Sequence, residues 1–321
     1  MSENFEPVKG ASLWKDAWKR LLKNKLAVFG MIVIGLMIIA VTIGPAIIRW
    51  TTGYTYDYIP SDVGSGELVK SFPPSWQHPM GTDDAGRDLL ARVLQGGRIS
   101  LMVGIISTVV SLIIGVSYGA TAGYLGGRID NFMMRIVDII YSIPYILIVI
   151  VLLNVFGGQN MPGWIQSLAN AFGGGQGLSQ IFLLFFALGL VSWLTMARVV
   201  RGQVLSLKNQ EFVMAARATG VSTPAIIFRH LVPNALGPVI VYATLTVPSV
   251  MLSEAFLSFL GLGVQAPYAS WGSLASEGIK NISVFPWQLI FPGVTMALTL
   301  FSLNFLGDGL RDALDPQTRK F

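Results

Sequence analysis

Few side chains in this sequence are suited to chemistry of their own. The 321 residues include no cysteine and only two histidines, His78 and His230, which lie far apart. Disulfides, thiolate catalysis and cysteine-based metal sites are therefore excluded. No group of residues in the sequence has the spacing that is typical of metal ligands. We therefore expect neither a metal ion nor a cofactor.

One charged cluster follows the first apolar run of the chain. It consists of Asp83, Asp84, Arg87, Asp88 and Arg92. Two neighbouring carboxylates are compatible with acid–base catalysis. A charged stretch beside a membrane, however, more often stabilises a loop or contacts a partner. We expect contact with an outer partner or stabilisation of the fold, and not catalysis.

A glycine-rich run at residues 173–177 is not a phosphate-binding loop. No Gly-Lys-Ser/Thr follows it, so the lysine that contacts a nucleotide is missing. We expect a flexible outer loop there. The chain is predicted not to be an enzyme, and any ATP that drives it must be bound by another chain.

Glu254 is the one acid inside an apolar run at 236–263. Acidic residues within a membrane are often functional. Its place near the outer end of the run leaves two alternatives, a role in a transport pathway or gate, and a structural hydrogen bond.

The elements that carry these residues are predicted from hydropathy. The chain is 53% hydrophobic and only 12% charged, against about a quarter charged in globular proteins. Runs of about 18 or more apolar residues are candidate transmembrane helices. Six such runs lie at about 26–49, 99–124, 132–156, 179–197, 236–263 and 286–306. We predict an all-α polytopic membrane protein with six transmembrane helices.

The distribution of basic residues predicts the orientation. Lys and Arg number 16 in the segments on the side of the N-terminus and 5 on the other side. Since cytoplasmic loops carry the excess of Lys and Arg, both termini are expected in the cytoplasm. We expect a cytoplasmic segment at 1–25, the first transmembrane helix with an outer loop at 26–98, a transmembrane domain at 99–307 and a cytoplasmic tail at 308–321.

A small-residue stripe runs along the second apolar run. Ser107, Ser111, Gly115 and Gly119 recur at every fourth position. Such stripes let helix backbones approach closely in lipid. The stripe is expected to pack either against a second subunit or within this one.

The segment at 205–235 is too structured for a simple connector. Strong helix formers start at Glu211 and end at Gly220, a residue typical of helix termini. Thr223 is expected to cap a second helix with Pro224 at its first position, and Pro233 is expected to stop it. We therefore predict two short helices joined by a tight turn.

The surface of this predicted hairpin is unusually apolar. It combines a smooth patch with larger side chains: Ala215, Ala216, Ala218 and Gly220, with Phe212, Ile226, Ile227 and Phe228. Such an apolar surface outside the bilayer is expected to be shielded from water. The hairpin is expected either to lie on the membrane or to dock in a groove of a partner protein.

This segment resembles the coupling loop of bacterial ABC importer permeases, in which Glu-Ala-Ala is followed by a spaced Gly and an Ile-x-Leu-Pro. Ala215, Ala216, Gly220 and Pro233 match that pattern. The positions that depart from it are Met214, His230 and Val232. Glu211, one turn earlier, is a candidate substitute for the missing Glu.

Further motifs extend the resemblance over almost the whole chain. They are the segments at 78–83, 86–88, 96–100, 123–127, 134–138, 258–263 and 307–316. Together they resemble the C-type inner-membrane permease of the oligopeptide and dipeptide family of ABC importers.

The resemblance implies a subunit that forms half of a path for oligopeptides in the bacterial inner membrane. It also implies a homologous second permease, two cytoplasmic ATPase subunits, an extracytoplasmic solute-binding protein and contact with lipid, but no nucleic acid. Dipeptides, nickel, opines and glutathione are alternative substrates. A secondary transporter is a weaker alternative, because it needs its own coupling-ion site.

Overall fold

The computed structural model describes residues 13–59, 71–171 and 176–314. The expectations for residues 1–12, 60–70, 172–175 and 315–321 lie outside the described residues. Within those described, every regular element is helical, and the one bridge of strand type joins Thr82 to Asp88. The all-α fold class is confirmed. The helices are α1 (Leu13–Lys23), α2 (Lys25–Thr52), α3 (Leu89–Leu125), α4 (Gly127–Tyr141), α5 (Tyr145–Phe156), α6 (Gly163–Ala171), α7 (Gln176–Leu207), α8 (Glu211–Ala218), α9 (Thr223–Ala225), α10 (Val232–Phe259), α11 (Trp271–Ile279) and α12 (Trp287–Leu314).

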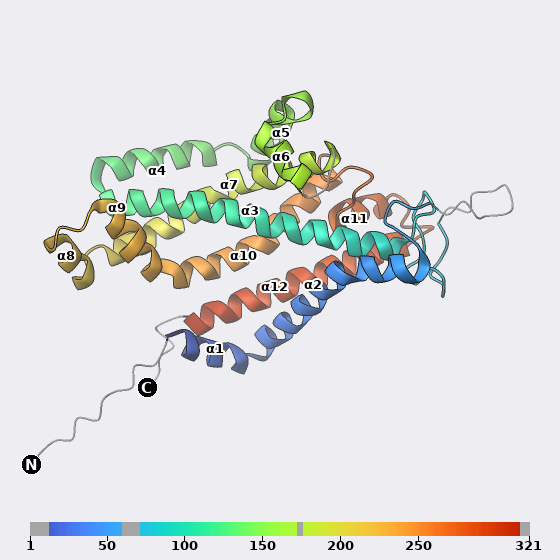
Figure 1. The fold of residues 1–321 in the computed structure, drawn as a ribbon, viewed down its shortest axis with the longest axis horizontal. Coiled ribbons are helices and arrows are strands. Elements are labelled where there is room, and N and C mark those ends of the chain that lie inside the picture. The colour runs from blue at the N-terminus through green and yellow to red at the C-terminus, as the bar shows by residue number, and fades with distance from the viewer. Residues whose placement is uncertain (1–12, 60–70, 172–175, 315–321) are drawn as a thin grey trace, which may run out of the picture.

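The long helices form an elongated bundle (Figure 1). Five helical segments among the described residues are long and apolar enough to cross a membrane, and α4 with α5 makes a sixth if the pair counts as one span. The five are Lys25–Thr52, Leu89–Leu125, Gly177–Leu207, Thr223–Phe259 and Trp287–Leu314. Each of the six predicted apolar runs is therefore largely helical, and three of them, at about 26–49, 99–124 and 179–197, lie wholly inside a longer helix.

The third predicted span, 132–156, is broken instead of straight. The axes of α4 and α5 meet at 85°. Pro144 stands at the break, in an extended conformation just before α5. Its ring disfavours a helical conformation for the preceding residue, and its nitrogen cannot donate a hydrogen bond. The sequence contained this signal, but the hydropathy of the run concealed it.

The charged outer segment is shorter than predicted, because α3 begins at Leu89 and not near residue 99. Asp88 caps this helix, since its Oδ1 accepts a hydrogen bond of 2.8 Å from the Ala91 amide. The predicted outer loop at 26–98 thus includes the first turns of α3. At the other end of the chain, α12 continues to Leu314, well into the predicted tail.

The stripe of small residues on α3 packs within this chain, against α7. Ser107 donates a hydrogen bond of 2.7 Å to the carbonyl of Phe185. A Cβ on Gly115 would collide with Met196, and one on Gly119 with the Ala197 carbonyl. Of the two alternatives left open by the sequence, packing inside the subunit is the one observed.

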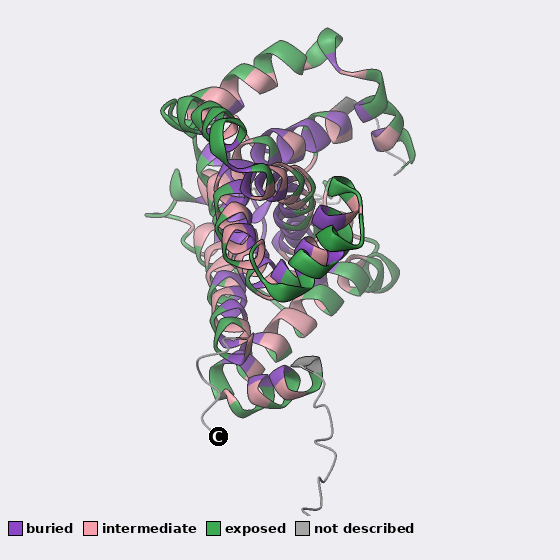
Figure 2. Ribbon diagram, turned by 90° about the vertical axis from the view of Figure 1, so that its left-hand side faces the viewer, coloured by how far each residue is buried: buried purple, intermediate pink, exposed green. Residues whose placement is uncertain are grey.

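The outer surface of the bundle is apolar over much of its length. Figure 2 shows exposed residues along the outer faces of the long helices and buried residues inside. On α2, Ile32, Leu36 and Ile43 are more than half exposed. In water such a surface would be an interaction site, whereas along a helix of this length and hydropathy lipid is the natural cover.

Several functional elements gather at one end of the bundle. The helices α8 and α9 lie at the same end as α1 and the end of α12 (Figure 1). Here α1 packs on α12 through Ala17, Leu21 and Ala313. The loop after α2 and the helix α11 lie at the opposite end. This placement agrees with an even number of crossings between the two ends of the described chain.

Candidate functional site

The predicted hairpin is present between α7 and α10, and its turn is built as the sequence indicates. α8 ends before Gly220, whose φ of 75° is the left-handed conformation that glycine adopts without strain. The Val221 amide donates to the Ala216 carbonyl at 3.1 Å, which closes the end of the helix. A tight turn therefore fixes the angle between α8 and the following helix.

The second arm of the hairpin differs from the prediction at both of its ends. Ser222, not Thr223, precedes the helix, and no side chain caps it. Pro233 does not stop it either. Residues Ile226–Leu231 form a π-helical turn, and α10 follows directly, so that Thr223–Phe259 is one continuous helical segment. Pro233 stands in the first turn of α10, a position where proline is tolerated.

The continuity of this segment has a mechanical consequence. The second arm of the hairpin is joined to a membrane span without an intervening loop. A displacement of the hairpin would therefore act on α10 through a continuous helix. The hairpin has the construction of a lever.

The surface of the hairpin is divided between a buried side and an exposed side. Ile226 and Ile227 are buried with Val213 and Ala216 in a cluster that includes residues of α3, α7 and α10. The large exposed side chains are Phe212, Met214 and Phe228, at 37%, 52% and 51%. Of the four large apolar side chains predicted for this surface, Ile226 and Ile227 are therefore buried. Phe212 and Phe228 are exposed and available to a partner.

The predicted coupling residues are likewise divided between exposed and buried positions. Glu211, Ala215, Gly220 and Pro233 are exposed, whereas Ala216 is buried. Glu211 lies in the first turn of α8, where an acid is favoured by the helix dipole. The exposed face thus combines an acid, small residues and three large apolar side chains.

Sequence reasoning missed the contacts that anchor the end of α7 and the hairpin to the connection between α3 and α4, residues 123–130. Arg201 near the end of α7 binds Asp130 of α4 through two hydrogen bonds of 2.6 and 2.7 Å. Lys208 donates to the Gly123 carbonyl at 3.2 Å, and Arg217 of α8 donates to the Tyr124 hydroxyl at 3.2 Å. These contacts join the end of α3 and the start of α4 to the end of α7 and to α8, the first arm of the hairpin.

Two acids of α4 bind basic residues of α7. Asp130, the partner of Arg201, is only 5% exposed. Asp138 binds Arg198 at 2.8 Å. A usable signal in the sequence was that these are the only acids between Leu125 and Tyr141, whereas 198–208 carries three basic residues.

Glu254 is buried inside the chain at the outer part of α10, with 1% of its surface exposed. Its Oε1 accepts hydrogen bonds from the hydroxyls of Ser258 at 2.6 Å and Ser270 at 2.7 Å. Ser270 also caps α11. Glu254 therefore joins the end of α10 to α11, and the geometry favours the structural alternative over a pathway or gate.

The charged cluster is a partly buried network that holds the loop before α3, with Asp83, Asp88 and Arg92 as its buried members. Arg92, 1% exposed, binds Asp83 and also Glu277 of α11, the latter at 2.8 Å. Arg87 adds a second bond to Asp83 at 2.7 Å, and His78 binds Asp88 at 2.8 Å. The network supports the expectation of fold stabilisation. No group of three or more potential metal ligands occurs among the described residues.

Together these features define a class of protein. The chain is a bundle of membrane spans with a helical hairpin exposed at one end, as in the membrane subunit of a transport system. Residues 111–320 match the family described as the binding-protein-dependent transport system inner membrane component. Residues 12–63 match the N-terminal transmembrane domain of oligopeptide transport permease C.

The chain belongs to the family of binding-protein-dependent transport system inner membrane components, and it is a multi-pass protein of the bacterial inner membrane. It is similar to three proteins named oligopeptide transport system permease protein OppC. The one from Salmonella typhimurium is 49% identical over 319 residues, 99% of this chain and 95% of that protein. Those from Haemophilus influenzae and Bacillus subtilis are 46% and 44% identical over 312 residues, 97% of this chain and 91% and 92% of theirs.

Proposed function

We propose that this chain is the permease subunit of an ATP-driven importer that carries oligopeptides. It forms half of the path together with a homologous second permease. Two cytoplasmic ATPase subunits bind and hydrolyse the ATP, and an extracytoplasmic solute-binding protein delivers the peptide. The chain itself is a non-catalytic subunit without a cofactor.

The observation that carries this proposal is the exposed hairpin in rigid continuity with α10. ATP hydrolysis elsewhere has to move membrane helices, and a stiff element between the two is what such coupling needs. The exposed Phe212, Met214 and Phe228 supply apolar contacts for a groove of a partner. The similarity to oligopeptide permeases over nearly the full chain supports the choice of substrate.

The proposal places both termini in the cytoplasm. The hairpin, α1 and the end of α12 share one end of the bundle (Figure 1). The same end carries most of the Lys and Arg residues of the chain. The excess of positive charge supports a cytoplasmic position for that end.

The proposal is tested by reconstitution in liposomes. The chain alone is expected to hydrolyse no ATP and to carry no labelled oligopeptide across the membrane. Uptake should appear when the second permease, the ATPase subunits and the binding protein are all present, and each omission should abolish it. Uptake by the chain alone would contradict the proposal.

The turn of the hairpin gives a more local prediction. Gly220→Val is expected to weaken association with the ATPase subunits at least about tenfold, because a β-branched residue at positive φ costs on the order of 1–3 kcal/mol and reorients α8. Steric overlap does not contribute to this effect, since no atom lies within 4 Å of a Cβ built at Gly220. Gly220→Asn is the matched control, because Asn tolerates this conformation. Co-purification measures both, and equal retention of the ATPases would contradict the role of the turn.

A further inference from the structure

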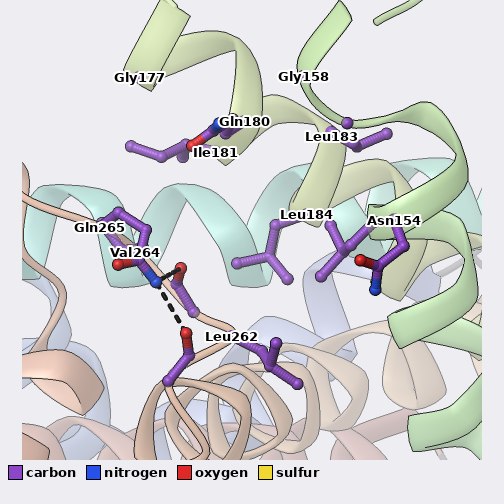
Figure 3. A pocket seen from close by; sticks show the side chains of 14 residues that line it. Asn154, Gly158, Gly177, Gln180, Ile181, Leu183, Leu184, Leu262, Val264 and Gln265 are labelled. Carbon is purple, nitrogen blue, oxygen red and sulfur yellow. Dashed lines mark hydrogen bonds between the residues drawn. The ribbon is translucent and has the colours of Figure 1, made fainter. Parts of the chain in front are cut away.

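The outer half of the bundle contains a hollow that takes no part in the lever. It has a volume of about 390 Å³ and lies between the end of α5, the start of α7 and the loop after α10 (Figure 3). Three carboxamide side chains line it, those of Asn154, Gln180 and Gln265. Apolar side chains, among them Leu184 and Leu262, complete the wall.

A second hollow of about 540 Å³ adjoins the first and shares Gly158 and Gln180 with it. Its wall adds the carboxamides of Gln159, Gln166 and Asn170. Each hollow falls within the range of about 300–1,000 Å³ that is typical of ligand pockets. We call the two hollows together the carboxamide groove.

Two of these carboxamides are oriented by bonds to the backbone. The Gln265 Nε2 donates to the carbonyls of Gly261 and Gly263, at 2.9 and 3.3 Å, and the Asn154 Nδ2 donates to the Ile150 carbonyl at 2.8 Å. Their oxygens have no hydrogen-bond partner among the described residues. In Figure 3 the hollow lies between these two side chains, with Gln180 above it. The groove thus offers fixed acceptors to a ligand that carries N–H donors.

The groove also lacks charge. None of the described residues that line it has a formal charge. A charged wall would repel ligands of like charge and favour those of opposite charge. A neutral wall of donors and acceptors instead satisfies groups that every peptide has, the main-chain N–H and C=O, which need partners wherever they leave water.

We propose that the carboxamide groove binds the main chain of the transported peptide on the outer side of the bundle, and that its neutrality makes the subunit tolerant of peptide side chains. This inference rests on the proposed function as an oligopeptide importer. It assigns to this chain a ligand contact of its own, in addition to the mechanical role of the hairpin.

The test introduces a charge into the groove of the complete transporter. Gln180 is suited to the change, because its side chain is exposed and makes no hydrogen bond among the described residues. Uptake into liposomes is measured for three peptides of equal length, one neutral, one rich in lysine and one rich in glutamate. Ser283→Glu and Ser283→Lys, on the exposed loop after α11, are the matched controls.

Gln180→Glu is expected to raise the ratio of basic to acidic peptide uptake about fivefold, and Gln180→Lys to lower it about fivefold, because partly desolvated charges a few ångströms apart interact appreciably. The Ser283 variants should leave the ratio unchanged. Unchanged uptake ratios in both Gln180 variants, or an equal loss of uptake for all three peptides, would contradict the role of the carboxamide groove but not the proposed function. A wild-type transporter that carries none of the three peptides would overturn the proposed function, and the groove with it.

Discussion

Gly119→Leu is expected to leave almost no folded protein in the membrane. Gly119 lies where α3 and α7 are in closest contact, and a Cβ there would overlap the carbonyl oxygen of Ala197 and crowd its Cα. Both obstacles are backbone atoms, so rotation of a side chain gives no relief. Overpacking costs about 1–3 kcal/mol where side chains can adjust, and here two helices must separate. The yield of monodisperse protein and its thermal unfolding temperature measure the effect.

Gly35→Leu is the matched control for this prediction. Gly35 also lies within a membrane helix, α2, but no atom is found within 4 Å of a Cβ built there. Leucine is a better helix former than glycine by up to about 0.8 kcal/mol, so stability should be unchanged or slightly higher. Equal behaviour of the two variants would show that α3 and α7 are not packed as closely as described.

The bundle itself could be predicted because hydropathy is a local property. Each apolar run of the sequence is largely helical in the structure, because a helix satisfies its own backbone groups within lipid. The small residues of α3 predicted a close contact between helices but did not identify the second helix. The contact with α7 could not be predicted, because a stripe of glycines and serines fits any smooth surface.

Helix ends were predicted less well than helix bodies. Gly220 was recognised because positive φ has a strong residue preference. Pro233 misled the prediction, because it stands in the first turn of α10, where proline is tolerated, and the helix continues. Pro144 was overlooked, although a proline inside an apolar run is a sign of a break. Local rules therefore failed where the wider backbone could adapt.

Interactions between distant segments were the least predictable part of the site. Asp130 binds Arg201, Glu254 binds Ser270 and Arg92 binds Glu277, across 71, 16 and 185 residues of sequence. No periodicity within a helix relates such residues, and their pairing depends on how the helices pack. The contacts that stabilise the hairpin and the outer loop thus became visible only with the tertiary structure.

Asp130→Asn is expected to uncouple the transporter, so that the number of peptides carried per ATP hydrolysed falls about tenfold. Asp130 is nearly buried, whereas Arg201 is one-third exposed. Breaking a buried pair costs about 3–5 kcal/mol, and the exposure of Arg201 reduces this cost by screening. The hairpin then keeps its exposed face for the ATPases but loses its anchor on α4. Parallel assays of ATP hydrolysis and peptide uptake in liposomes give the ratio.

Asp138→Asn is the matched control, because Asp138 makes the same type of ion pair between the same two helices but in an exposed place. The side chains of Asp138 and Arg198 are 61% and 39% exposed, and such pairs contribute only about 0–1 kcal/mol. A double variant, Asp130→Asn with Arg201→Gln, should lose less than the two single variants together, since no unpaired charge remains. If Asp138→Asn lowers the ratio as much as Asp130→Asn, the buried anchor is not what couples the hairpin to the spans.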